Sequence, residues 1–129
     1  MADYITIKGY TLQNRTSDPL ATGVAGAAWA SGGNLPVALY ENAGAGTTHS
    51  AALNFGGQGN DPSPAHPHSA DTQTYNGTSW TEVNNLNNSR RSLSGAGTQT
   101  SALAFGGYTT PPGSDGTQVH TESWNGTSW

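Results

Sequence analysis

The sequence predicts an all-β fold built from two tandem four-stranded repeats, the second of them incomplete. The main observation is a sequence repeat: the segment from Gly44 to Trp80 recurs from Gly95 to Trp129, with a period of about 50 residues. The composition, with 18 glycines and 9% charged residues, disfavours helices. Within each copy, short apolar runs alternate with turn residues, as expected of β-strands.

The two copies match at fixed landmarks. Phe55-Gly56-Gly57 recurs 50 positions later as Phe105-Gly106-Gly107, and Asn76-Gly77-Thr78-Ser79-Trp80 recurs 49 positions later as Asn125-Gly126-Thr127-Ser128-Trp129. Such repeats are supersecondary units that bury their apolar faces only when copies stack. Function is therefore expected on the loops that connect the strands.

The N-terminal residues differ from the repeats. Apolar residues between Tyr4 and Gln13 have strand-like spacing, interrupted at Gly9, so residues 1–13 are predicted to be one extended docking segment. Residues 14–27 are rich in Thr, Ser, Gly and Ala and are predicted to be a linker.

Tryptophan spacing sets the boundary between linker and repeats. Trp29 lies 26 positions before Phe55, and Trp80 lies 25 positions before Phe105, so Trp29 and Trp80 are equivalent. The repeats are accordingly assigned to residues 28–80 and 81–129.

The second repeat indicates where its strands lie. Residues 93–98 and 101–105 are predicted to form a hairpin around Gln99-Thr100, and residues 119–124 the next strand. Asn125-Gly126 then predicts a two-residue type I′ turn, since this dipeptide tolerates positive φ at both central positions. The fourth strand is expected to begin at the last residue of the sequence.

The first repeat shows that fourth strand in full. Residues 79–83 follow the Asn76-Gly77 turn and alternate polar and apolar side chains. Each repeat is thus predicted to be a four-stranded antiparallel meander. Four strands in about 50 residues match a β-propeller blade better than a solenoid or sandwich unit.

The repeats resemble the kelch repeat of β-propellers over residues 28–129, which implies kelch-like propeller blades. The first repeat departs from the kelch pattern because Leu39-Tyr40-Glu41 stands where an arginine is expected, and in the second a tryptophan replaces the usual tyrosine. The matching residues are Gly56, Gly57, Tyr75 and Trp80, then Gly106, Gly107, Trp124 and Trp129.

The sequence of the turns and strand ends includes Asn125-Gly126-Thr127-Ser128-Trp129, Gly95-Ala96-Gly97-Thr98-Gln99-Thr100 and Ala104-Phe105-Gly106-Gly107. It resembles kelch-type repeats in predicted tail-fibre and other virion proteins of marine bacteriophages. The resemblance implies a structural or adhesive virion protein that is made in the host cytoplasm, with residues 4–13 contacting other virion or appendage proteins. The loops 58–70, 84–90 and 108–118 are expected to share one surface, which would contact a host glycan or protein.

Both the function and the assembly of the chain have alternatives. The alternative function is a small oligomeric carbohydrate-binding or protein-interaction module of cellular origin, located in the cytoplasm or at the cell surface. Propellers close with about four to eight blades, so two repeats imply one of three things. The chain is a fragment of a longer product, as its end at Trp129 favours; or it closes as a homo-oligomer; or its N-terminal segment completes the second repeat of a neighbour.

Candidate binding residues lie on the predicted loops. Among the kelch-like features, one arginine of Arg90-Arg91 is expected to bond loop carbonyls or a neighbouring carboxylate, while a sugar acid or sulfate is the alternative ligand. Trp29, Trp80 and Trp129 are expected to pack between repeats, although sugar stacking is the alternative. The six candidates are Asp61, His66, His68, Arg90, Arg91 and Tyr108.

Several functions are excluded by composition. The net charge of −4 gives no electrostatic footprint for nucleic acid, and no long apolar run indicates membrane insertion or a secretory signal. Because cysteine is absent and His66-Pro67-His68 offers two ligands without a third, no metal site is predicted. No catalytic motif or cofactor-binding motif is found, so the expected protein is not an enzyme.

Overall fold

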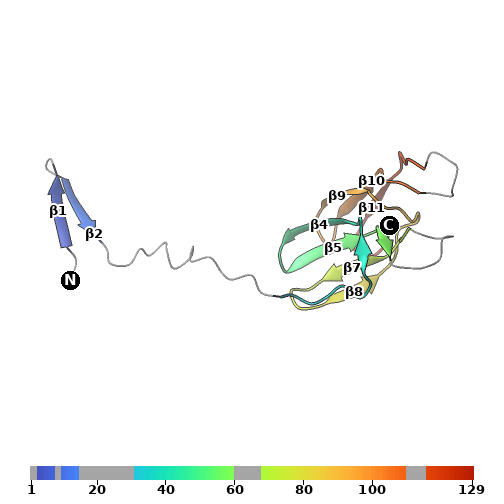
Figure 1. Ribbon diagram of the computed structural model, residues 1–129, viewed down its shortest axis with the longest axis horizontal. Coiled ribbons are helices and arrows are strands. Elements are labelled where there is room, and N and C mark those ends of the chain that lie inside the picture. The colour runs from blue at the N-terminus through green and yellow to red at the C-terminus, as the bar shows by residue number, and fades with distance from the viewer. Residues whose placement is uncertain (1–2, 8–9, 15–30, 60–67, 110–115) are drawn as a thin grey trace. The chain divides into compact units, whose positions relative to one another are not determined.

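The computed structural model describes residues 3–7, 10–14, 31–59, 68–109 and 116–129. These residues form β-strands and no helix, so the fold is all-β with antiparallel sheets, as predicted (Figure 1). The chain divides into two compact units, Met1–Ser31 and Gly32–Trp129. In the described part of the chain, no helix is long and apolar enough to span a membrane.

The first unit contains a β-hairpin. Strand β1 (Asp3–Ile7) pairs antiparallel with β2 (Tyr10–Asn14), in a register that joins Asp3 to Asn14 and Ile7 to Tyr10. The sequence predicted one extended piece here. Folding back lets each strand satisfy backbone N–H and C=O groups of the other, which a single extended segment leaves unpaired.

The second unit begins with a four-stranded sheet, here called the first sheet. It contains β4 (Ala43–Thr48), β5 (Ala51–Phe55), β7 (Thr72–Tyr75) and β8 (Trp80–Val83), paired antiparallel in the order β4-β5-β7-β8. This order is the meander predicted for the first repeat. The boundary predicted between the repeats, after residue 80, falls inside β8.

The second sheet repeats three of these strands. Strands β9 (Ser94–Gly97), β10 (Ala102–Phe105) and β11 (Thr121–Trp124) pair antiparallel in the order β11-β10-β9. Two short strands, β3 (Leu39–Tyr40) and β6 (Gln58–Gly59), form a separate two-stranded sheet. The second sheet lies beside the first, with β9 against β4 (Figure 1).

The two sheets share one register. Phe55 pairs with Thr72 across β5 and β7, and Phe105 pairs with Thr121 across β10 and β11. The backbone before each first strand also repeats, because Glu41 and Ser92 adopt φ angles of 55° and 50°. The sequence repeat is therefore also a structural repeat, apart from a β-bulge between Gly46 and Thr48 that the second sheet lacks.

The Asn-Gly turns differ from the predicted type. Only the glycine of each pair has positive φ, and four residues rather than two connect the strands. The Asn76 side-chain oxygen accepts hydrogen bonds from the N–H groups of Thr78 and Ser79, both at 2.9 Å, and Asn125 makes the equivalent pair. This side-chain bonding stabilises a longer turn, so positive φ at asparagine is not needed.

The core lies between the sheets. Leu53 and Phe55 of β5 are fully buried, and the Phe55 ring meets the Trp129 ring edge-on at 4.8 Å between centroids. The Trp129 indole N–H also donates to the Thr72 hydroxyl at 3.0 Å, while its ring packs against Trp124. Trp129 thus joins the two sheets, which is the packing role that the sequence favoured over sugar stacking. Trp80 instead packs against Tyr75 of its own sheet and lines an open groove, so the same expectation was wrong for Trp80 among the described residues.

Candidate functional site

The loop between the two sheets is hydrogen-bonded to a loop of each sheet. The Gly57 N–H donates to the Arg90 carbonyl at 2.7 Å, and the Arg90 N–H donates to the Ser69 carbonyl at 3.1 Å. Arg91 and Tyr108 exchange two backbone hydrogen bonds of 3.1 and 2.9 Å. The described parts of loops 58–70, 84–90 and 108–118 therefore lie together, as the strand order predicted.

Glycine pairs allow this close approach. Gly57 and Gly107 have φ angles of 104° and 96°, which side-chain-bearing residues rarely adopt. A Cβ atom on Gly107 would lie 2.8 Å from the Arg91 carbonyl oxygen, and one on Gly57 equally close to that of Tyr40. Gly56 and Gly106 also have positive φ. The backbone conformation therefore requires glycine at these positions.

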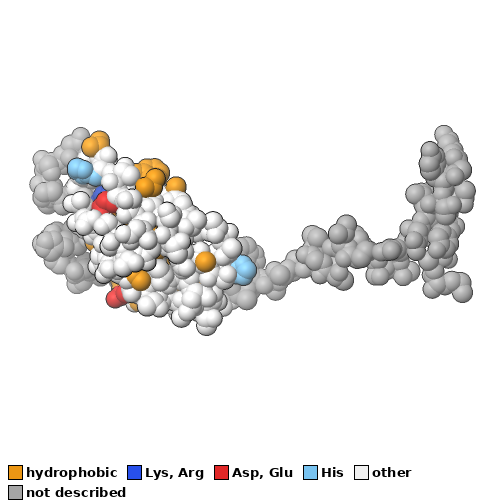
Figure 2. Space-filling model, turned by 180° about the vertical axis from the view of Figure 1, so that it is seen from behind, with side chains coloured by type: hydrophobic (Ala, Val, Ile, Leu, Met, Phe, Trp, Pro, Cys, Tyr) orange, Lys and Arg blue, Asp and Glu red, His pale blue; other side chains and the backbone are white. Residues whose placement is uncertain are grey.

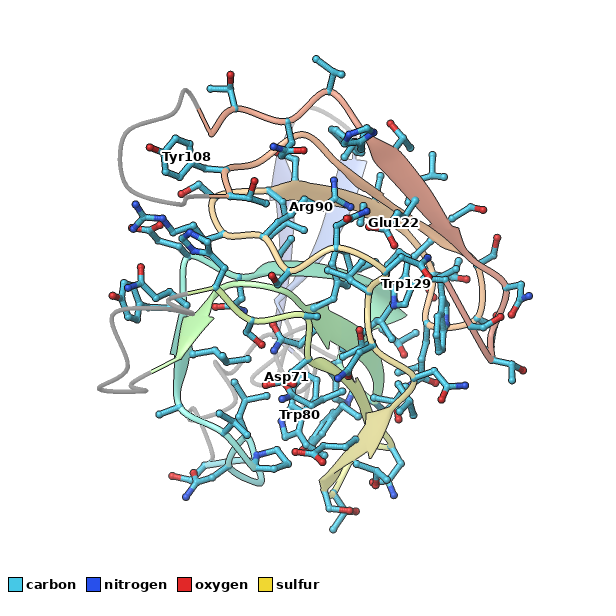
Figure 3. The ribbon with its side chains drawn as sticks, turned by 90° about the vertical axis from the view of Figure 1, so that its right-hand side faces the viewer. Asp71, Trp80, Arg90, Tyr108, Glu122 and Trp129 are labelled. Atoms are coloured by element: carbon cyan, nitrogen blue, oxygen red, sulfur yellow. The ribbon has the colours of Figure 1, made fainter. Side chains whose placement is uncertain are left out.

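Arg90 points into the second sheet. Its guanidinium donates to the carbonyls of Gly106 and His120 at 3.0 and 2.9 Å and to the Glu122 carboxylate at 2.8 Å (Figure 3). The residue is fully buried. Bonding of loop carbonyls and a carboxylate is the role that the kelch resemblance implies for one arginine of the pair, and it removes Arg90 from the exposed surface.

The first repeat replaces this ion pair by a neutral one. Leu39 stands at the position equivalent to Arg90, and Gln73 stands at the position of Glu122. Gln73 instead accepts a 2.7 Å hydrogen bond from the buried Asn54 amide. The missing arginine of the first repeat is therefore matched by a missing carboxylate, since either charge alone would be buried unpaired.

Arg91 turns the other way, toward solvent. Its guanidinium donates to the Gln58 side-chain oxygen at 2.8 Å, lies 3.5 Å from the Glu41 carboxylate and stands 5.3 Å from the centre of the Tyr108 ring. Ser92 donates to the same carboxylate at 2.7 Å. Three different segments thus fix the half-buried guanidinium in one orientation.

His68 completes this group. Its ring meets the Tyr108 ring edge-on, with 6.2 Å between centroids. Burial lowers the His68 pKa below its usual value of 6.5, and the nearby Arg91 charge lowers it further, while Glu41 opposes the shift. The imidazole is consequently neutral at pH 7.

An open pocket of about 420 Å³ lies at this group. It offers one carboxylate, one guanidinium, hydroxyl groups and an aromatic ring, which suits a polar, uncharged or weakly acidic ligand better than an apolar one. Its lining residues are Glu41, Arg91, Ser92, Gly107, Tyr108 and Thr117. We use the name Arg91 cluster for Glu41, Gln58, His68, Arg91, Ser92 and Tyr108.

Three of the six predicted binding residues meet in the Arg91 cluster, namely His68, Arg91 and Tyr108. Arg90 is separate and buried. Asp61 and His66 lie outside the described residues, as does Trp29. Sequence reasoning missed three members of the cluster, Glu41, Gln58 and Ser92. The position of Glu41, 51 residues before Ser92 in the repeat, was the available signal.

On the face drawn in Figure 2, charged side chains are few and hydrophobic ones stand in small groups. Within residues 31–59, 68–109 and 116–129, no three His, Asp or Glu side chains gather in a way that could hold a metal ion. Comparison with known protein families and with curated proteins found no match.

Proposed function

We propose that this chain is a non-enzymatic structural and adhesive component of a virion appendage, such as a phage tail fibre. Its two sheets act as kelch-like propeller blades, and the Arg91 cluster contacts a molecule on the host surface. One observation supports this proposal above all. Residues from three segments that are distant in sequence, at Glu41, at Arg91 with Ser92, and at residues 107–117, line one open pocket.

The chemistry of the pocket favours a saccharide. The face and hydroxyl of Tyr108 suit stacking against a sugar ring, while Arg91 and Glu41 supply a donor and an acceptor for sugar hydroxyls. Glu41 already neutralises part of the Arg91 charge, so a neutral sugar or one bearing a single carboxylate fits better than a polyanion.

The binding experiment uses the full chain on an array of bacterial surface saccharides, followed by titration calorimetry on the best ligand. Arg91→Met and Tyr108→Ala are expected to weaken binding at least about tenfold, the loss of about 1.4 kcal/mol of contact energy. Val119→Ser is the matched control, because Val119 is 94% exposed and does not line the pocket. Unchanged thermal unfolding must accompany each loss.

Equal binding by all variants, or the absence of saccharide binding by the unaltered chain, contradicts this site. The same pocket chemistry also favours a second function, a small carbohydrate-binding module of cellular origin. Detection of the chain in purified virions by mass spectrometry supports the virion role. Its presence only in uninfected cells supports the cellular one.

A further inference from the structure

The contact between the two sheets has a clear centre. The Phe55 ring lies between Trp129 and Gly95, with 4.8 Å between the Phe55 and Trp129 ring centroids. A Cβ atom on Gly95 would lie 2.5 Å from the Phe55 Cζ atom, so the glycine makes room for the ring. Phe55 is completely buried as a result. We call Phe55 the knob and Gly95 with Trp129 its socket.

The repeat supplies a second knob and a second socket. Phe105 is equivalent to Phe55, Gly44 to Gly95, and Trp80 to Trp129. Each residue has the same type as its equivalent, so the chain contains the residues for this contact twice. Among the described residues, however, the second knob does not insert into the second socket.

The second knob is exposed. Phe105 and its neighbour on the same face, Leu103, are 39% and 45% exposed, whereas Phe55 and Leu53 are 0% and 1% exposed. Ala102 and Ala104, whose side chains alternate to the other face of β10, are buried. The Phe105 face of the second sheet therefore points away from the first sheet.

The second socket is open. Gly44 and Trp80 line a groove of about 700 Å³ on the first sheet. Among the described residues, a Cβ atom on Gly44 would meet only the Leu53 carbonyl, at 3.2 Å, and no ring takes the place that Phe55 takes at Gly95. Trp80 packs against Tyr75 of its own sheet at 5.0 Å, which holds one wall of the groove in place.

We propose that this chain associates head to tail with further copies of itself, with Phe105 of one copy inserting between Gly44 and Trp80 of the next. Knob and socket lie on faces that point away from the contact between the sheets, so one chain cannot join its own pair. The partner is a second copy because the chain's own sheet contact shows which surface fits this socket. Burial of Phe105 and Leu103 drives the association.

One hydrogen bond is expected to recur across the new contact. Inside the chain, the Trp129 indole N–H donates to the Thr72 hydroxyl at 3.0 Å. The equivalent donor is Trp80, and the equivalent acceptor is Thr121, which is exposed. Buried indole N–H groups need such a partner.

Another pair of bonds does not recur. The Gln99 side chain donates to the carbonyls of Ala52 and Tyr75 at 3.1 and 2.6 Å, so it fastens the second sheet to the first. The residue equivalent to Gln99 in the first repeat is His49, because Thr48 pairs with Ala51 as Thr98 bonds to Ser101, and a neutral imidazole has only one N–H to donate. The contact between copies is therefore weaker than the contact within the chain. A head-to-tail contact leaves a free knob and a free socket, so it builds either a closed ring or a filament.

The test uses sedimentation velocity of the full chain over a wide concentration range. The unaltered chain is expected to form assemblies larger than a dimer as its concentration rises. Phe105→Ala removes the knob and Gly44→Val fills the socket, so each variant alone is expected to remain a monomer. A mixture of the two is expected to form only a one-to-one dimer, because one variant retains the socket and the other the knob.

Controls keep this test decisive. Thr127→Ser changes an exposed turn residue that belongs to neither the knob nor the socket and is expected to assemble like the unaltered chain. Leu103→Glu, at another exposed position of the knob face, replaces Phe105→Ala if that variant unfolds. A monomer at every concentration, or assembly by the knob and socket variants equal to that of the unaltered chain, overturns the proposal. Saccharide binding is measured separately, so failure of the adhesive function does not affect this result.

Discussion

The Arg90 guanidinium and the Glu122 carboxylate form a buried ion pair of 2.8 Å within the second sheet. Glu122 also accepts hydrogen bonds from the backbone N–H and the side-chain amide of Asn87, at 2.7 and 2.9 Å. The pair thus ties the segment between the sheets to β11, and it holds this segment in the position from which Arg91 reaches the open pocket.

Substitution of Arg90 is expected to destabilise the fold strongly. Arg90→Leu leaves the Glu122 carboxylate and two carbonyls without their donor, so the free energy of unfolding should fall by about 3–5 kcal/mol in urea denaturation. The double variant Arg90→Leu with Glu122→Gln imitates the neutral pattern of the first repeat and should recover part of this loss. Equal losses in the single and double variants would contradict the ion-pair account.

The two phenylalanines of the repeat should differ sharply in their effect on stability. Phe55→Ala opens a cavity between the sheets and is expected to cost about 3–5 kcal/mol. Phe105→Ala removes a ring that is 39% exposed and should cost under about 1 kcal/mol. Chemical denaturation at low protein concentration, where the chain is monomeric, measures both. Similar costs at the two positions would contradict the assignment of Phe55 to a buried contact and of Phe105 to an open one.

His68 should make stability depend on pH. Its pKa is lower in the folded chain than the usual 6.5, so the unfolded chain binds more protons in the window between the two values. Stability is therefore expected to fall as the pH drops from about 6.5 to the lower folded pKa. Thermal unfolding at a series of pH values checks this, and His68→Gln should flatten that part of the curve. An unchanged curve for His68→Gln would assign the dependence to other groups.

The sequence predicted more of the strand pattern than of the local turn geometry. The four-stranded order of the first sheet and the clustering of the loops both follow from the repeat and its apolar runs. The type I′ turn at Asn125-Gly126 was wrong, because the propensity of a dipeptide does not reveal side-chain bonds to later backbone groups. The N-terminal hairpin was also missed, since strand pairing is not contained in local spacing.

The candidate site was predicted in part. His68, Arg91 and Tyr108 were chosen because they lie on loops of one expected surface, and they meet in the structure. Glu41 and Gln58 were missed because they approach Arg91 through pairing of distant segments, which no short motif encodes. Local sequence also does not distinguish Arg90 from Arg91, yet the first is fully buried and the second only half-buried.

By itself, the sequence determined that the chain is a repeated all-β unit, because periodic glycines, apolar residues and turn residues act locally on the backbone. Only the tertiary structure determined which member of each pair of equivalent residues is buried. Leu53 and Leu103 have the same type and the same register, yet one is 1% and the other 45% exposed. Burial depends on whether another sheet lies against that face, and only the arrangement of the sheets in space determines this.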